Sequence, residues 1–359
     1  MMSATIIFLW LAAVPIVPIN AEQEAIDTVA ESSRVFIPAK LIERTSPIYP
    51  QFELRHRKQA WVRIAYCIDE SGSPHNISVL DSVGNAKFDN AAIETVEQWK
   101  FEPALINGEP SWQCRNRTGI TFALKGSNTG ASKGFAKYYR RIGRLIDENK
   151  LEEADKVFWQ VYESYNLSLY ELSKLWAQRV RYETISGNMY MLDMALHRAA
   201  ASKGKWIEKK SYIRLLELRV QVELKIGQYY SAMRAFRELA KVSGKDSEKI
   251  LALKPTMKKL RDTIKSDQVL KIEAEVRTKD ECNICNNSWA FTPVRSDFSF
   301  ANIAGTLDSI ELRCNHRLFE SAVTGHVEWH IPDSWGTCHV QVYGEPGTTF
   351  DVLMLPSGS

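Results

Sequence analysis

The six cysteines lie near the two ends of the 359-residue chain, and its long middle has none. Cys67 and Cys114 come early, and the other four come late: Cys282, Cys285, Cys314 and Cys338. An even number of cysteines in an exported protein is typical of disulfides. Each end can therefore form its bridges internally. The sequence divides into an early cross-linked part, a cysteine-free middle and a late cross-linked part.

The N-terminal residues indicate export. Residues 6–14 form an apolar run that Pro15, Pro18 and Ala21 follow, before the chain turns polar at Glu22. This pattern predicts a cleaved signal peptide over residues 1–21, with Ala21 last before the cut. The alternative is an uncleaved membrane anchor. The run is shorter than the roughly 20 apolar residues that a spanning helix needs.

Composition narrows the class of protein. Hydrophobic residues make up 45% and charged residues 25% of the chain, which is typical of a soluble globular protein. The net charge of +3 is too small to favour nucleic acid as a partner. A chain of this length suits two or three domains.

The early part combines two strands, a helix and a third strand. Residues 61–68 alternate between two faces, a turn follows at 69–74, and residues 76–80 make the second strand of a hairpin. A helix capped by Asn85 or Asp89 carries an apolar stripe that ends at Trp99. Residues 119–124 alternate again as a closing strand.

Several motifs in this part occur in an order that resembles a known family. They are Ser46-Pro47-Ile48-Tyr49-Pro50, the strand and turn from Trp61 to Gly72, Phe88 to Ile93, Trp99 to Ala104, Asn107-Gly108 and Gly119 to Phe122. Together they resemble the C-terminal domain of TonB energy transducers. We therefore expect a TonB C-terminal-like ββαβ domain over residues 41–125, after a polar lead-in over 22–40.

The resemblance implies a periplasmic domain that contacts an outer-membrane TonB-dependent receptor, or another envelope protein, in a Gram-negative bacterium. An extended receptor segment would add a strand to an exposed sheet edge. The edge implied here is the last strand, with Ile120 and Phe122 facing inward: Thr118, Gly119, Ile120, Thr121, Phe122, Ala123 and Leu124. The transducers of this family also carry an inner-membrane anchor and a proline-rich spacer. Neither pattern is evident here, so we expect a binding module rather than an energy transducer, with anchoring in the inner membrane as the alternative location.

The middle of the chain is predicted to be helical. A small polar linker over 126–132 precedes residues 133–268, where apolar residues recur three and four positions apart. Helix–turn–helix junctions are predicted at Asn149, Gly187 and Gly227, spaced 38 and 40 positions apart. The pattern is similar to that of tetratricopeptide repeats, whose helical hairpins stack on one another. The remaining residues, 269–359, indicate a small disulfide-rich β domain, with strands predicted from short alternating runs at 310–313, 327–331, 339–343 and 350–355.

The cysteine pairs allow several interpretations. Cys67 and Cys114 suit a disulfide, and the alternative is two free buried thiols. The four late cysteines suit two disulfides or a redox-active pair at 282–285. A third possibility is a zinc site in which Cys314 or His316, and Cys338 or His339, join the pair at 282–285. We favour two structural disulfides in which Cys282 and Cys285 each reach across to Cys314 or Cys338, because a bridge between the two adjacent cysteines closes a short strained ring.

Other chemistry is sparse in the sequence. His316, His326, His330 and His339 fall in the last domain, where a metal cluster is conceivable and scattered histidines are the default. No nucleophile elbow, phosphate loop or metal-binding helix motif occurs, so we expect no enzyme, cofactor, bound metal or small-molecule substrate. Lysines and arginines make the helical middle basic, which indicates either a solvated face or an anionic envelope partner.

Three functions follow from these patterns. The first is an accessory of TonB-dependent transport that binds a receptor segment by strand addition. The second is a periplasmic scaffold that acts through its helical repeats, while the TonB-like domain is structural or binds peptidoglycan. The third is a metal-dependent envelope sensor.

Overall fold

The computed structural model of the chain describes residues 35–124, 130–164, 166–201, 205–278, 287–324 and 327–356. The predicted signal peptide, Cys282, Cys285, His326 and most of the lead-in and linker lie outside these ranges. Within them, no helix combines the length and apolar character that a membrane crossing requires.

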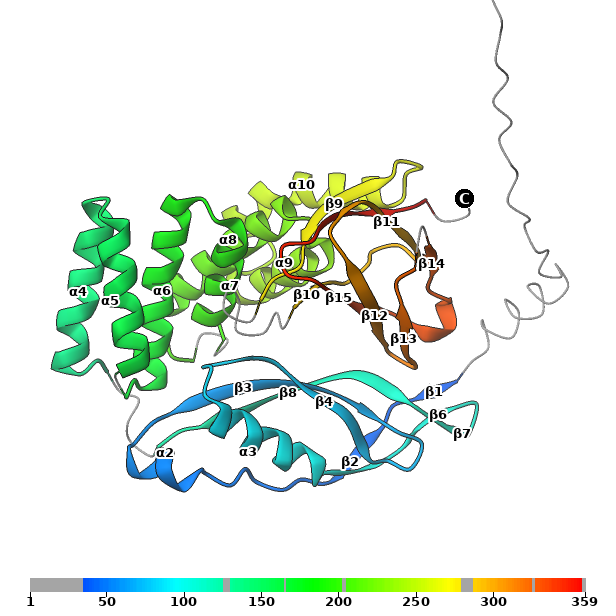
Figure 1. The fold of residues 1–359 in the computed structure, drawn as a ribbon, viewed down its shortest axis with the longest axis horizontal. Coiled ribbons are helices and arrows are strands. Elements are labelled where there is room, and N and C mark those ends of the chain that lie inside the picture. The colour runs from blue at the N-terminus through cyan, green and yellow to red at the C-terminus, as the bar shows by residue number, and fades with distance from the viewer. Residues whose placement is uncertain are drawn as a thin grey trace, which may run out of the picture.

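The N-terminal part contains the predicted strand–strand–helix–strand order. A three-stranded antiparallel sheet runs in the order β4-β3-β8, and α3 packs on one face of it (Figure 1). The elements of this sheet and its helix are β3 (Ala60–Ile68), β4 (Pro74–Ser82), α3 (Ala86–Glu97) and β8 (Gln113–Phe122). Asn85 caps α3, because its side chain accepts a hydrogen bond from the backbone N–H of Lys87. Sequence could not decide between Asn85 and Asp89 for this role.

Alternation along β3 explains how this sheet buries one face. Val62 and Ile64 join Phe88, Val96 and Phe122 in one core, while Trp61 from the opposite face packs against the core of the helical region. Both faces of the sheet are therefore covered, one by α3 and the other by a later part of the chain.

The lead-in is shorter than the sequence predicts. Two short strands begin inside the predicted irregular segment, because each finds a partner beyond α3: β1 (Phe36–Ile37) pairs with β6 and β2 (Lys40–Glu43) pairs with β5. The other small elements of this part are α2 (Gln51–Arg55), β5 (Lys100–Glu102), β6 (Ala104–Ile106) and β7 (Glu109–Ser111).

The middle of the chain is helical, as predicted. Its helices are α4 (Lys133–Asp147), α5 (Leu151–Ser164), α6 (Leu169–Ser186), α7 (Met189–Ala199), α8 (Lys209–Lys225), α9 (Tyr229–Ser243) and α10 (Glu248–Ile264). Each helix packs against the next along the chain, and α4 also contacts α6. The junctions predicted at Asn149, Gly187 and Gly227 all separate consecutive helices. The tetratricopeptide interpretation of these hairpins stays a prediction.

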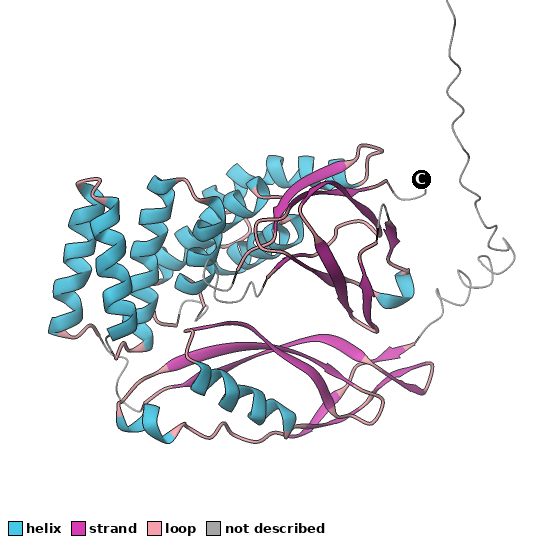
Figure 2. Cartoon of the chain, in the orientation of Figure 1, coloured by secondary structure: helices cyan, strands magenta, loops and turns pink. Residues whose placement is uncertain are grey.

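The last part is β-rich (Figure 2). Two four-stranded antiparallel sheets, ordered β10-β15-β12-β13 and β14-β11-β16-β9, share one hydrophobic core. The strands are β9 (Leu270–Glu275), β10 (Ser288–Phe291), β11 (Asp297–Ala304), β12 (Leu307–Cys314), β13 (Leu318–Ala322), β14 (Glu328–His330), β15 (Cys338–Gly344) and β16 (Thr349–Met354), with a 3-10 turn at Asp333–Trp335. Among the described residues, the buried side chains form three hydrophobic cores, and the division of the chain into three domains stays a prediction.

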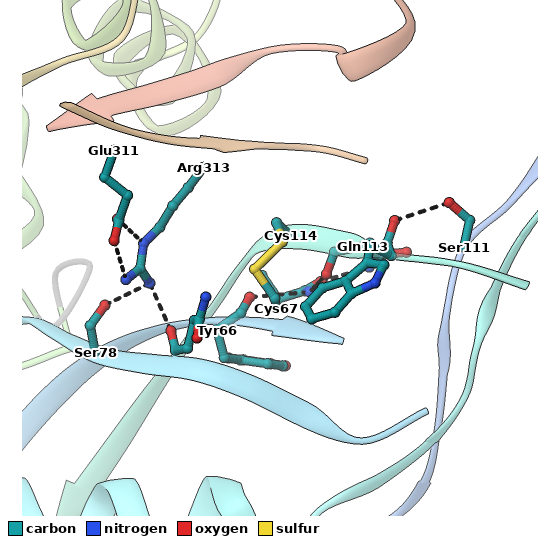
Figure 3. Close-up of a disulfide and its surroundings, with 11 residues drawn as sticks. Tyr66, Cys67, Ser78, Ser111, Gln113, Cys114, Glu311 and Arg313 are labelled. Carbon is teal, nitrogen blue, oxygen red and sulfur yellow. Dashed lines mark hydrogen bonds and ion pairs between the residues drawn. A yellow bond between two sulfur atoms is a disulfide. The ribbon is translucent and has the colours of Figure 1, made fainter. Parts of the chain in front are cut away.

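The helical region and the β-rich part both lie over the face of the N-terminal sheet that is turned away from α3 (Figure 1). Tyr162 on α5 donates a hydrogen bond to the Val83 carbonyl at 2.6 Å. From the β-rich part, the Arg313 guanidinium of β12 donates to the Asn76 carbonyl and to Ser78 on β4 (Figure 3). Side chains from both later parts therefore hold the N-terminal sheet.

Candidate functional site

Strand β8 forms one edge of the N-terminal sheet. It pairs with β3 along its length, and no other strand in the described part of the chain pairs with it. An edge strand presents a row of backbone N–H and C=O groups that another strand can use. Of the residues predicted for this edge, 118–122 lie in β8, whereas Ala123 and Leu124 follow the end of the strand. The proposed edge is thus two residues shorter than predicted.

The two faces of β8 differ in the way that the sequence predicts. Ile120 and Phe122 are buried, at 4% and 2% exposure, and Phe122 packs against the rings of Phe88 and Tyr49. Gly119 and Thr121 between them are exposed. The core thus anchors the strand through alternate side chains and leaves the others outside.

The space around Gly119 is open. A Cβ atom placed there would meet no other heavy atom within 4 Å. Gly119 faces Arg63 in the register of the sheet, so it belongs to the face turned toward the helical region. The glycine leaves its backbone uncovered at the centre of the predicted edge.

The first residues of β8, by contrast, are held by the β-rich part. The backbone N–H of Cys114 donates to the Asn315 carbonyl at 2.8 Å, and the guanidinium of Arg115 donates to the Thr337 carbonyl at 3.1 Å. Cys114 also forms a disulfide with Cys67 on β3 (Figure 3). Accordingly, only the later half of the edge is available to a partner.

The Cys67–Cys114 bridge is the pairing that the sequence favoured. The predicted bridges from Cys282 and Cys285 to Cys314 and Cys338 are wrong, because Cys314 and Cys338 bond to each other. They lie directly opposite on the neighbouring strands β12 and β15, so their proximity follows from the register of the sheet.

Acidic and basic side chains tie β3 and β4 to the helical region. Asp81 on β4 accepts from Arg63 on β3 at 2.9 Å and from Arg198 on α7 at 3.1 Å. Arg198 is buried, with its guanidinium 4.6 Å from the ring of Trp176. This buried carboxylate therefore neutralises cations from two parts of the molecule. Sequence reasoning missed it, because Asp81 and Arg198 are 117 positions apart.

The histidines of the β-rich part do not gather into a cluster where the structure describes them. His330 contacts Asp297 at 2.6 Å, and His339 contacts Thr292 at 3.3 Å. The one group in the described ranges with possible metal-ligand geometry is Asp193, His197 and Glu223, on α7 and α8. The Arg219 guanidinium lies 2.8 Å from Glu223 and supplies a positive charge there already. The four-residue spacing of Asp193 and His197 on one helix was the available sequence signal.

The N-terminal part matches one protein family. A family described as "Gram-negative bacterial TonB protein C-terminal" matches residues 45–124. A TonB protein of Vibrio cholerae serotype O1 is 29% identical over 89 residues, which are 25% of this chain and 36% of that protein. A TonB protein of Xanthomonas campestris pv. campestris strain B100 is 33% identical over 78 residues, 22% of this chain and 34% of that protein. The chain spans about a third of the length of these curated relatives.

Two solved structures each match part of the chain. The C-terminal domain of Pseudomonas aeruginosa TonB is 20% identical and covers 24% of this chain and 87% of its own, with a TM-score of 0.21. TonB2 of Vibrio anguillarum is 20% identical and covers 32% of this chain and 95% of its own, with a TM-score of 0.20. By the family match, residues 45–124 are similar in sequence to the C-terminal domain of Gram-negative TonB proteins, and the helical and β-rich parts lie outside that match.

Proposed function

We propose that this protein is a periplasmic, non-enzymatic component of TonB-dependent transport that binds an extended segment of an outer-membrane receptor. The segment pairs with the later half of β8, residues 118–122. The role is binding rather than catalysis, as the resemblance of residues 45–124 implies.

The observation that carries this proposal is the uncovered edge of β8. Its buried side chains Ile120 and Phe122 fix the strand in place, so the backbone groups of β8 are already arranged for pairing. The strand itself therefore loses little conformational entropy when a partner binds. Gly119 has open space around it, which allows the backbone of a second strand to approach closely. The first residues of β8 cannot contribute, because Asn315 and Thr337 contact them.

Hydrogen exchange of the full chain tests the proposal. The probe is a synthetic peptide with the sequence of the N-terminal extended segment of a TonB-dependent receptor from the same genome. Strand addition should slow amide exchange within 118–122, because new backbone hydrogen bonds form there. A scrambled peptide of the same composition is the control. Unchanged exchange across 118–122 at saturating peptide would contradict the proposal.

The second candidate is a scaffold that acts through its helical region. The exposed face of α10 favours it, because Lys254, Lys258 and Arg261 lie on one side of the helix and no carboxylate lies within 4.0 Å of them in the described part of the chain. This role predicts that a bound envelope protein protects amides on α10 and leaves β8 unchanged. The same exchange measurement therefore separates the two functions.

A further inference from the structure

Four arginines meet where the N-terminal sheet, α9 and the β-rich part join. Arg115 and Arg117 lie on β8, and Arg234 and Arg237 lie on α9. The Arg115 guanidinium lies 5.3 Å from the centre of the Tyr230 ring on α9, which fixes the position of the helix relative to the strand. Tyr230, Arg234 and Arg237 follow one another at four and three positions, so they share one face of α9.

The strand contributes its arginines from the matching side. Arg117 lies opposite Ala65, and Arg63 is the next residue of β3 on the same face. Trp61, two residues earlier, packs against the helical core. Arg117 is therefore on the sheet face turned toward the helices, where it interacts electrostatically with Arg234.

No carboxylate within 4.0 Å neutralises these four arginines in the parts of the chain that the structure describes. Three other arginines of the elements around them are paired: Arg63 with Asp81, Arg219 with Glu223 and Arg313 with Glu311. Arg117, Arg234 and Arg237 are solvent-exposed, so a ligand can reach them. Four arginines that gather without a carboxylate where three parts of the molecule join indicate a site for an external anion.

The directions in which nearby pKa values shift agree with this excess of positive charge. The packing of protein atoms around the Arg117 guanidinium removes part of its water although the residue keeps an exposed surface, and this loss, followed by the charges of Arg234 and Arg115, lowers the pKa of Arg117 to about 10. Burial alone would raise the pKa of Tyr230, but Arg115, Arg234 and Arg237 outweigh it and hold that pKa below its ordinary value. Burial and then Arg117, Arg115 and Arg313 lower the pKa of His339 to about 3, so this side chain stays neutral and adds no charge.

We propose that Arg117, Arg234 and Arg237 recognise carboxylate side chains of the peptide segment that pairs with β8, while Arg115 adds positive charge beside them, so that the segment must be acidic. This inference rests on the proposed function. A strand added to β8 lies about 4.8 Å from it, and every second side chain points to the face of Arg117. Glutamate or aspartate at those positions would meet the guanidinium groups of β8 and α9 directly.

Arginine offers more than a general attraction for anions. Its planar guanidinium donates two parallel hydrogen bonds to one carboxylate, which gives geometric selection as well as charge. A lipid headgroup is the other common anion of the envelope. The position of the four arginines beside a sheet edge, between three parts of the molecule, favours an extended chain over a membrane surface.

Binding to two peptides tests the inference with the full chain. One peptide alternates valine with glutamate, and the other replaces each glutamate by glutamine. We expect the acidic peptide to bind about tenfold more tightly in low salt, and the difference to shrink as ionic strength rises. The double variant Arg234→Gln/Arg237→Gln should lose this preference and still bind, because it leaves β8 itself unchanged. The matched control Lys258→Gln/Arg261→Gln removes two exposed cations from α10 and should retain the preference.

The outcomes distinguish this inference from the proposed function. Equal affinity of the wild-type chain for both peptides overturns the inference, and exchange protection within 118–122 would then still support strand addition. If neither peptide protects 118–122, the proposed function fails as well. Binding of phosphatidylglycerol vesicles that requires Arg234 and Arg237, with no preference for the acidic peptide, would assign the cluster to lipid and overturn the inference.

Discussion

At the scale of single residues, Arg115 illustrates how the edge strand is shaped. Its φ of 60° lies in the left-handed region, where a non-glycine residue costs about 1 kcal/mol or more. The register shifts here, because β8 places two residues, Cys114 and Arg115, opposite the single β3 residue between Tyr66 and Ile68. Such a bulge turns a side chain toward a new direction. The bulge places the Arg115 guanidinium against Tyr230 and the Thr337 carbonyl, so the strained backbone helps to hold β8 against α9 and the β-rich part.

Gly119 gives the first prediction. Its φ is not positive and a Cβ there meets nothing within 4 Å, so a larger residue needs no rearrangement. We expect Gly119→Thr to raise the free energy of unfolding by about 0.5–1 kcal/mol, because glycine in a strand loses more backbone entropy and threonine favours strands. Urea denaturation followed by circular dichroism measures the change. A destabilised variant would mean that this position is already filled in solution.

At the scale of elements, the sequence signals that succeeded were local ones. Asn149, Gly187 and Gly227 all have positive φ, at 57°, 80° and 75°, and these residue types tolerate that conformation. The junction before α6 carried an equally local signal that we did not use. Ser168 and Glu171 form a capping box, in which each side chain accepts from the other residue's backbone N–H.

The strands that the sequence missed lacked such signals. In β11, Phe298 and Phe300 alternate, but the chain then departs from regular pairing near Asn302, whose φ is 51°. In β10, three of four side chains are buried, so no alternation marks the strand. β9 starts shortly after the end of α10, where helical periodicity dominates the pattern. The pairing partners of these strands are far away in the chain, and periodicity contains no information about them.

The two described disulfides give a prediction for their elements. Cys67–Cys114 spans 47 positions and Cys314–Cys338 spans 24. On the loop-entropy model, Cys67→Ser/Cys114→Ser should lower the free energy of unfolding by about 4 kcal/mol, and Cys314→Ser/Cys338→Ser by about 3.4 kcal/mol. Both variants are compared with the wild type by urea denaturation at one protein concentration.

The positions of the two bridges predict different local effects. The first variant should also speed amide exchange at the start of β8, because Cys114 is the residue whose N–H reaches Asn315. The second should leave β8 exchange unchanged and affect only β12 and β15, which Cys314 and Cys338 join. If both variants alter β8 to the same extent, the bridges do not act on separate parts.

At the scale of the whole molecule, the packing of the three parts was beyond the reach of the sequence. The cysteine distribution and the periodicities indicate separate parts joined by a flexible linker. The structure instead joins them through side chains that sequence cannot pair, such as Arg313 with Ser78, 235 positions apart. The resemblance that locates the edge strand also cannot show that Asn315 and Thr337 cover its beginning, because the β-rich part lies outside the family match. The contacts that cover the beginning of the edge strand can be known only from the fold.

Asp81 gives the prediction that belongs to this scale. Its carboxylate pairs with Arg63 inside the sheet and with the buried Arg198 of the helical region, so Asp81→Asn removes one charge and leaves a buried cation without its counter-ion. Such a loss typically costs about 3–5 kcal/mol. Because the bond joins two parts, we also expect β3 and β4 to exchange amide hydrogens at lower urea concentrations than α6 and α7 do, whereas in the wild type they exchange together. Lys40→Gln is the control, since it removes only the exposed pair with Glu102 and should leave both patterns unchanged. If Asp81→Asn lowers stability but β3 and β4 still exchange together with α6 and α7, then Asp81 acts within the sheet and does not join the sheet to the helical region.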